Sequence, residues 1–232
     1  MADLSDMRHP YHGIDFKFDM SDLASRDPIK QFEAWFEDIR KNKKVEEPNA
    51  MALATATRSG IPSVRIVLCK NISPEGFTFF TNYESKKGKE LEENPQCSLM
   101  FYWEPLKRSV RIEGKVEKIS TDKSKEYFNS RPKESQIGAI VSNQSTVIPD
   151  RQTLDRKLKD LKEQYGGDDV TVPKPDYWGG FLVRPYQFEF WQGQTNRLHD
   201  RIQFRKLSDG ETFNETLMVK GEGDWIIERL SS

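Results

Sequence analysis

The sequence predicts a mainly β fold of the α+β class, a β-barrel with peripheral helices. Many short runs alternate apolar with polar side chains, which is the period of a strand. A few other segments repeat apolar residues at helical spacing. The 232 residues, 35% hydrophobic and 31% charged, suit one domain of the barrel kind. A polar chain with so modest a hydrophobic content also suggests that some apolar surface is buried between subunits.

Residues 1–26 are expected to form a flexible N-terminal arm, because they are polar and show no regular apolar period. Residues 27–232 are expected to form a single domain. Its first helix should begin at Asp27-Pro28, where Asp serves as the N-cap and Pro suits the first helical position. The apolar face of this helix comprises Ile29, Phe32, Trp35, Phe36 and Ile39.

After this helix the apolar residues recur at every second position. The expected strands alternate with a few further helices. The expected strands are Met51–Thr57, Ser63–Lys70, Phe77–Asn82, Cys97–Trp103, Arg108–Ile119, Trp178–Arg184, Tyr186–Gln192, Arg197–Arg205 and Trp225–Leu230. The further helices are a start at Ser85, then Thr121–Asn129 and Asp150–Tyr165, with a short apolar element at Ser135–Ser142. We expect Arg65 to be half-buried among apolar neighbours and therefore to have an anionic partner.

Composition excludes several classes of function. The net charge of −1 argues against a general binder of nucleic acid or membranes. The sequence has neither the Gly-x-Gly-x-x-Gly pattern nor a P-loop, and it has no Gly-x-Ser-x-Gly elbow. Its three histidines form no convincing metal cluster. An enzyme with so few acid-base groups would take its chemistry from a cofactor.

Cys69 and Cys97 lie in apolar, strand-like runs without metal-type spacing. We interpret them as reduced core residues. Met1 to Gly13 contains no apolar signal core, and no apolar run has the length of a membrane span. The expected location is cytoplasmic.

The stretch Gln194–Ile202 holds the most unusual side chains. If it is extended, Arg197, His199 and Arg201 point to one face. Arginine binds phosphate or carboxylate with a planar fork, and histidine titrates near neutrality. This face would therefore suit an anionic, ring-shaped ligand, although the solvated face of an edge strand is the alternative interpretation.

Other basic groups point to phosphate as well. Lys86 and Lys87 lie at an expected helix N-terminus, which favours anions, but they would equally suit a solvated helix. Tyr127, Arg131 and Ser135 are spaced by four, as on one helical face, although Pro132 should interrupt that helix. Such clusters in a near-neutral chain would suit two phosphorylated ligands.

Several motifs resemble the pyridoxine/pyridoxamine 5′-phosphate oxidase family. The run from Phe188 to Ile202 is similar to that family's C-terminal signature. The supporting matches, in family order, are Arg65–Lys70, Phe79–Asn82, Phe101–Pro105, Tyr127–Pro132, Ser135–Gly138, Gln144-Ser145, Trp178–Gly180 and Glu228–Leu230. The resemblance runs from about residue 8 to the end of the chain.

The resemblance implies an FMN-binding split β-barrel and a homodimer with FMN at its interface. The implied FMN-binding residues are Arg65, Ile66, Val67, Leu68, Phe80, Thr81, Lys86, Lys87, Ser109, Gln144, Ser145, Trp191 and Arg201. Lys86 stands where the family commonly has Arg, and Ser109 where it commonly has Gln. Both departures bear on flavin affinity, since Lys lacks the bidentate fork of Arg and Ser is short.

The implied reaction is oxidation of pyridoxamine or pyridoxine 5′-phosphate to pyridoxal 5′-phosphate, with oxygen as acceptor and hydrogen peroxide as product. The implied catalytic residues are Arg197 and His199. The implied substrate-binding residues are Arg8, Tyr11, Lys70, Tyr127, Arg131, Ser135, Arg197, Leu198 and His199, with the arm acting as a lid. Two alternatives remain: a split barrel that binds FMN or pyridoxal phosphate without turnover, and a split-barrel flavoenzyme with another electron donor such as a reduced nicotinamide.

Overall fold

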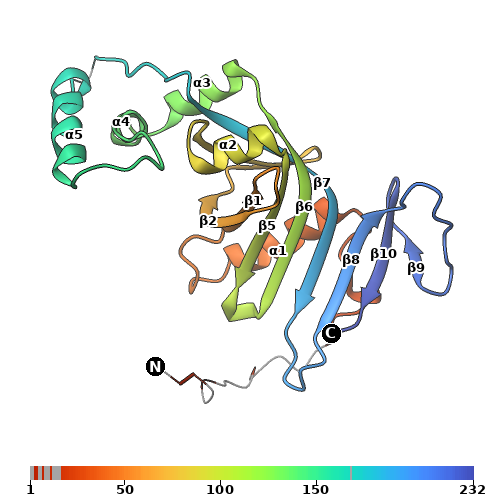
Figure 1. Cartoon of the computed structure of the whole chain (residues 1–232). Coiled ribbons are helices and arrows are strands. Elements are labelled where there is room, and N and C mark those ends of the chain that lie inside the picture. Colours follow the sequence, from red (N-terminus) through yellow and green to blue (C-terminus); the bar gives the residue numbers. More distant parts are fainter. Residues whose placement is uncertain (1–2, 5–6, 8–10, 12–16, 168) are drawn as a thin grey trace. The chain divides into compact units, whose positions relative to one another are not determined.

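The computed structural model describes residues 3–4, 7, 11, 17–167 and 169–232. Its described strands pair in the order β2-β1-β5-β6-β7-β8-β10-β9, with β4 bonded to β7 and β3 to β4 (Figure 1). The chain divides into two compact units. The first comprises residues 1–52, 98–113 and 185–232, and the second comprises residues 53–97 and 114–184. The mainly β, α+β class expected from the sequence is confirmed.

The strands are β1 (Ala50–Ala56), β2 (Pro62–Leu68), β3 (Asn71–Ser73), β4 (Gly76–Asn82), β5 (Gln96–Trp103), β6 (Arg108–Lys118), β7 (Trp178–Gln192), β8 (Asp200–Lys206), β9 (Met218–Lys220) and β10 (Trp225–Leu230). The helices are α1 (Pro28–Arg40), α2 (Lys86–Glu93), α3 (Thr121–Ser130), α4 (Lys133–Val141) and α5 (Gln152–Tyr165), with 3-10 turns η1 (Met20–Asp22) and η2 (Glu104–Leu106).

Helix α1 begins as its sequence predicts. The Asp27 carboxylate accepts hydrogen bonds from the backbone N–H groups of Ile29 and Lys30, at 2.7 and 3.2 Å. These bonds satisfy two donors that have no partner inside the helix. The helix buries Phe32 against Phe101, with ring centroids 4.9 Å apart, so its apolar face belongs to the core of the first unit.

Strand β7 is continuous, whereas the sequence predicted two strands on either side of Pro185. Residues Trp178–Val183 pair with β4, and residues Gln187–Gln192 pair with β8. Pro185 lies between these two pairings, so its missing N–H removes no hydrogen bond from either ladder. Proline is compatible with extended backbone wherever its N–H is not needed.

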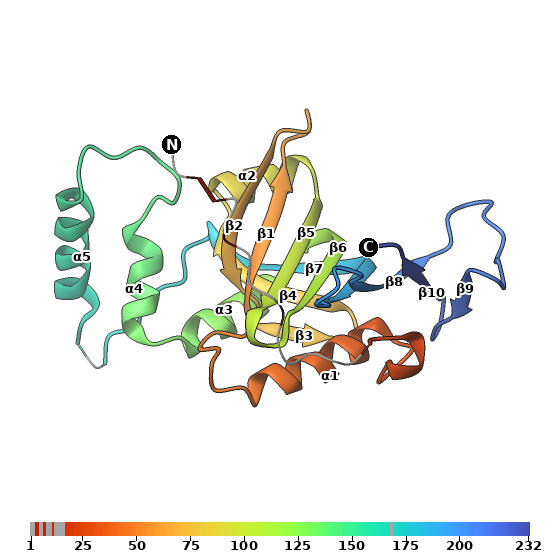
Figure 2. The ribbon, with the colours of Figure 1, turned by 90° about the horizontal axis from the view of Figure 1, so that it is seen from below.

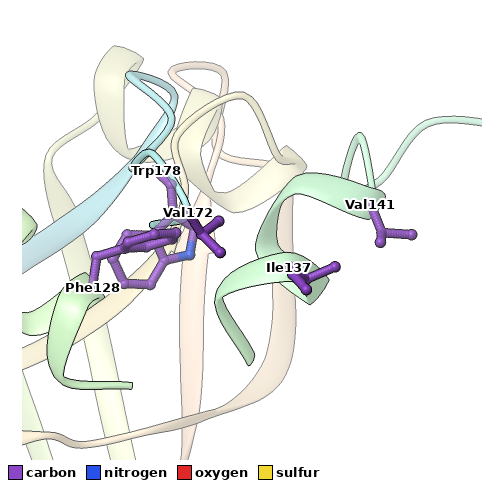
Figure 3. Close-up of a cluster of buried hydrophobic side chains, with 5 residues drawn as sticks. All are labelled: Phe128, Ile137, Val141, Val172 and Trp178. Carbon is purple, nitrogen blue, oxygen red and sulfur yellow. The ribbon is translucent and has the colours of Figure 1, made fainter. Parts of the chain in front are cut away.

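The second unit has its own apolar cluster, which includes Phe128, Ile137, Val141, Val172 and Trp178 (Figure 3). Helices α4 and α5 lie side by side in both views (Figures 1 and 2). The expected short apolar element at Ser135–Ser142 is therefore part of a helix, α4, whose buried residues Ile137 and Val141 belong to this cluster.

Strand β2 stands at one end of the strand order and exposes apolar side chains. Val64 and Ile66 are each 68% exposed. Arg65 points to the other face and is half-buried, as its neighbours in the sequence predicted. An exposed apolar stripe on a terminal strand is typical of a surface covered by another chain.

Candidate active site

A pocket of about 620 Å³ lies in the second unit. Residues of β2, β4, α2, α3, α4 and β7 line it, together with the segments that follow β2, α3 and α4. It brings together many residues that the sequence assigned to cofactor and substrate: Ile66, Val67, Leu68, Lys70, Phe80, Thr81, Lys87, Tyr127, Arg131, Ser135 and Gln144. Residues distant in the chain therefore converge on one cavity.

Lys87 is the buried cation of this pocket. The Ser85 side chain caps α2 and places Lys87 in the first helical turn. The Lys87 ammonium donates to Thr81 Oγ1 at 3.3 Å and to Gln144 Oε1 at 3.1 Å. Burial lowers the pKa of Lys87 to about 8, and the charge of Arg65 contributes in the same direction. Burial and Arg65 thus disfavour the charged form of Lys87, and an anionic ligand in the pocket would stabilise this charge.

Tyr127, Arg131 and Ser135 all line the pocket, but they do not share one helical face. Helix α3 ends at Ser130 and α4 begins at Lys133, since Pro132 disfavours helical backbone at the residue before it. The arrangement comes from the bend between two helices. The spacing of four therefore pointed to three residues that line one pocket, and the helix is interrupted at Pro132 as the sequence predicted.

The Arg131 guanidinium lies 4.8 Å from the centre of the Trp178 ring. Its Nη1 atom is buried and has no hydrogen-bond partner among the described residues. Burial lowers the pKa of Arg131 below its ordinary value. Buried guanidinium donors are normally paired, and Arg131 lines the pocket, so its unpaired donor fits an acceptor supplied by a ligand.

Three aromatic rings form one wall of the same pocket. Tyr127 stacks on Phe80 with centroids 3.8 Å apart, and Phe80 stacks on Trp178 at 5.4 Å. Trp178 is not among the site residues predicted from the sequence, although the Trp178-Gly-Gly180 motif was a usable signal. Gly180 leaves no room for a larger side chain, because an added Cβ would approach Ile119 Cδ1 to 2.5 Å and the Phe80 ring to 2.9 Å.

Other predicted cofactor residues do not line this pocket. Arg65 donates to Leu53 O at 3.0 Å, to Thr55 Oγ1 at 2.6 Å and to Ser63 Oγ, and it pairs with Glu90 at 3.4 Å. The anionic partner expected for Arg65 is thus Glu90. Lys86 and Ser145 are exposed, and Ser145 has a positive φ of 72°.

Glu90 is not among the site residues predicted from the sequence, where the helix that begins near Ser85 was expected either to bind an anion or to be a solvated helix. Burial would raise the pKa of Glu90, but hydrogen bonds from Ser63 and Thr55 and the charge of Arg65 hold the pKa below its ordinary value. The ionised carboxylate therefore keeps the Arg65 guanidinium beside β2. No periodicity in the sequence distinguishes a buried glutamate from an exposed one on such a short helix.

A pocket of about 500 Å³ lies in the first unit. Its lining residues are Tyr11, Met100, Tyr102, Ser109, Arg111, Glu189, Trp191 and Arg201, which include three of the predicted cofactor residues and one predicted substrate residue. Glu189 accepts from Arg111 at 2.7 Å and from Arg201 at 2.8 Å. The hydrogen bond to Glu189 raises the pKa of Arg201, so this arginine is held as a cation.

Arg197, His199 and Arg201 do not share a strand face, which corrects the central expectation from the sequence. Strand β8 begins only at Asp200, and Arg197 has a left-handed φ of 65°. Arg197 and Leu198 are exposed, whereas His199 is half-buried. The His199 ring lies 4.9 Å from Trp191 and 5.9 Å from Tyr11 between centroids. Arg8 lies outside the described residues.

Within the described part of the chain, no group of histidine, cysteine, aspartate or glutamate side chains could hold a metal ion. The described helices include none that is long and apolar enough to cross a membrane.

Comparison of the whole fold defines the class of protein. The crystal structure of PhzG from Burkholderia lata, in complex with tetrahydrophenazine-1-carboxylic acid, superposes with a TM-score of 0.78. It is 26% identical, and the match covers 94% of this chain and 98% of that one. The fold is the split β-barrel of FMN-binding proteins, as the sequence predicted.

Sequence comparison defines the family. Residues 38–165 match the family model described as pyridoxamine 5′-phosphate oxidase, and residues 178–232 match the pyridoxine 5′-phosphate oxidase C-terminal dimerisation region. Pyridoxine-5′-phosphate oxidase of Bos taurus is 54% identical over 99% of this chain and 87% of its own length. Pyridoxine/pyridoxamine 5′-phosphate oxidase of Bombyx mori is 51% identical over 99% and 89%. The chain belongs to the pyridoxamine 5′-phosphate oxidase family.

Proposed function

We propose that this chain oxidises pyridoxamine 5′-phosphate and pyridoxine 5′-phosphate to pyridoxal 5′-phosphate, with FMN as cofactor and oxygen as electron acceptor. Relatives that carry the corresponding names match it over nearly its whole length. The observation that carries the proposal is the buried Arg131 guanidinium, whose Nη1 atom lacks a protein partner. A phosphate ester supplies the missing acceptor, and both proposed substrates carry one.

The residues present fit FMN. Lys87 is a buried cation in the first turn of α2, where backbone N–H groups also favour a phosphate. Ile66, Val67 and Leu68 offer an apolar edge from β2. When bound, FMN would supply the redox chemistry of the site, as acceptor of a hydride from the substrate carbon that bears the amine or alcohol and as donor of the two electrons that reduce oxygen to hydrogen peroxide. The further proposed FMN residues are Arg65, Phe80, Thr81, Lys86, Ser109, Gln144, Ser145, Trp191 and Arg201.

The substrate phosphate is assigned to Lys70, Tyr127, Arg131 and Ser135. All four line the pocket of the second unit. Burial raises the pKa of the Tyr127 hydroxyl, so the group stays protonated and can donate to a phosphate oxygen. Arg131 then contributes charge, and Tyr127 and Ser135 contribute hydrogen bonds that orient the ester.

Arg197 and His199 are proposed to act on the reacting end of the substrate, where Arg197 would position it and stabilise developing charge. Leu198 is proposed to contact the substrate beside them. The N-terminal arm is proposed to close over the substrate through Arg8 and Tyr11. Tyr11 supports this role, because its carbonyl accepts from Thr195 Oγ1 at 3.0 Å within the loop that carries Arg197.

The active form is a homodimer. Residues 178–232 match a dimerisation region, and the exposed Val64 and Ile66 supply apolar surface that a second copy would cover. FMN is proposed to lie at the dimer interface. A cytoplasmic location is proposed as well, and it is supported by the two cysteines, Cys69 and Cys97, which are buried thiols and not a disulfide.

The test is the absorption spectrum of the purified, FMN-loaded protein under anaerobic conditions. Addition of pyridoxamine 5′-phosphate should bleach the flavin, and air should restore it. A flavin spectrum that persists with this substrate and with pyridoxine 5′-phosphate would contradict the oxidase. If a reduced nicotinamide then bleached it, the chain would be a flavoenzyme with another donor, and if nothing did, it would be a binding protein.

A further inference from the structure

Asp200 joins three segments of the first unit. It is 7% exposed and lies at the start of β8. Its Oδ2 atom accepts from the backbone N–H of Phe18 at 2.9 Å and from Gln194 Nε2 at 2.7 Å. Its Oδ1 atom accepts from Arg229 Nη1 at 2.8 Å. Both oxygens of this buried carboxylate are therefore engaged, and one of them holds the Gln194 side chain.

Arg229 of β10 completes the arrangement. Its Nη2 atom donates to the carbonyl of Phe18 at 2.8 Å and pairs with Asp19 at 3.0 Å. Asp200 and Arg229 thus bind the N–H and the C=O of the same residue, Phe18, whose ring is buried against Trp35 at 4.9 Å. The pair is tied to the core, so it provides a rigid support for Gln194.

The backbone N–H of Gln194 donates to His199 Nδ1 at 3.0 Å. A backbone amide is a donor only, so Nδ1 must be the unprotonated nitrogen of the ring. In a neutral imidazole the proton then lies on Nε2. Protonation of Nδ1 would place two donors opposite each other and would break this bond.

The surroundings of the ring agree with a neutral histidine. The groups that face it are the rings of Tyr11 and Trp191 and the charges of Arg197 and Asp200. Burial and Arg197 lower the pKa of His199, and Asp200 opposes them. The net direction is downward, although an aspartate is the next residue in the chain, because burial of the ring has a larger effect on its pKa than the charge of Asp200.

We propose that Asp200 and Arg229 are positioning residues that hold His199 as the neutral tautomer protonated on Nε2. His199 then acts on the substrate as a hydrogen-bond donor through Nε2, and its Nδ1 atom takes no part in proton transfer. This assignment rests on the proposed function, in which His199 contacts the substrate, but the tautomer itself can be measured without turnover.

The primary test is a ¹⁵N-histidine NMR spectrum of the FMN-loaded protein near neutral pH. Replacement of His9 and His12 by Gln leaves His199 as the remaining histidine and assigns its signals. The expected result is a pyrrole-type Nε2 and a pyridine-type Nδ1. A proton on Nδ1, or an imidazolium, would overturn the proposal. The result does not depend on activity, so a failure of the proposed function would be seen separately as the absence of substrate-dependent bleaching.

The second test addresses positioning with Asp200→Asn and Arg229→Lys, measured beside the exposed control Lys220→Met on β9. Asp200→Asn should mix the two tautomers of His199 and lower kcat/KM on the order of tenfold, with FMN content unchanged. Arg229→Lys keeps a positive charge and should retain more activity than Arg229→Met. An unchanged tautomer together with unchanged kcat/KM in Asp200→Asn would refute the positioning role, and so would an equal loss in the control.

Discussion

Replacement of Lys87 by Met should stabilise the FMN-free protein. Lys87 is buried, and its pKa is about 8 instead of the ordinary 10.5. At about 1.4 kcal/mol per pH unit, this difference means that the charge costs about 3 kcal/mol in the folded state. Methionine keeps an apolar stem of similar length and removes the charge.

The substitution leaves few buried polar atoms without partners, so most of this gain should be observed. Thr81 Oγ1 still donates to Gln144 Oε1 at 3.2 Å. Ser85 Oγ still donates to Asn82 O at 2.7 Å and accepts from the Gly88 N–H at 3.3 Å. After allowance for the lost Lys87 hydrogen bonds, we expect the free energy of unfolding to rise by about 1–3 kcal/mol at pH 7.

The gain should depend on pH in a defined direction. Below pH 8 Lys87 is charged in the folded and the unfolded protein, so the full cost is present. Between pH 8 and 10.5 the unfolded chain binds more protons at Lys87 than the folded protein, and the stability contribution rises with pH. The advantage of Lys87→Met over the wild type should therefore shrink between pH 7 and pH 10.

The assay is urea unfolding of the FMN-free protein at fixed protomer concentration, since a dimer's stability depends on concentration. Lys89→Met is the matched control, because Lys89 lies on the same helix and is exposed. A loss of stability at pH 7, or a gain that does not shrink by pH 10, would refute the reasoning. FMN affinity should move the opposite way and fall by at least about tenfold, because one charge-assisted phosphate contact is removed.

Three further predictions concern other parts of the chain. Arg131→Ala should raise the Michaelis constant for pyridoxamine 5′-phosphate by about 10- to 100-fold in steady-state kinetics, because a charge-assisted phosphate contact contributes about 1.5–3 kcal/mol. A pure turnover defect at saturating substrate would count against this prediction. Arg197→Ala and His199→Ala should lower kcat while FMN remains bound, and loss of flavin with normal turnover on added FMN would contradict their assignment. The hydrogen bond from Arg205 lowers the pKa of Glu211 to about 2, so its stabilising contribution is present above about pH 4.5 and lost as the pH falls toward 2. The stability of Glu211→Gln should therefore fall less steeply than that of the wild type as the pH is lowered over that range. Identical acid-unfolding curves for the two proteins would disprove the contribution.

Much of the fold could be predicted because local signals agreed with one another. The Asp27-Pro28 cap, the helical spacing from Ile29 to Ile39 and the period-two strands all persist in the structure. The convergence of Lys87, Arg131 and Gln144 on one pocket could not be derived from local rules, because it depends on long-range packing. The family resemblance supplied those residues instead.

The errors have physical causes that a sequence pattern does not reveal. Alternation predicted a strand through Arg197, but this residue adopts a left-handed φ that is uncommon outside glycine. Glu90 received no role in the prediction from the sequence, yet its side chain is only 5% exposed because Ser63, Thr55 and Arg65 surround it. In both cases tertiary contacts override the preference of the local segment.

The two cysteines gain significance from the product of the proposed reaction. An oxidase that releases hydrogen peroxide exposes its own thiols to an oxidant, and the thiolate is the nucleophilic form that reacts with peroxide. Burial raises the pKa of Cys69 and Cys97 to about 12 each, so at pH 7 only about 1 in 10⁵ of either thiol is ionised. Met100, 37% exposed in the pocket with Trp191, lacks this protection. Peptide mapping after prolonged turnover should therefore find sulfoxide at Met100 before any oxidation of the cysteines. Oxidation of a methionine, and not of a cysteine, would then limit how long each protein molecule remains active.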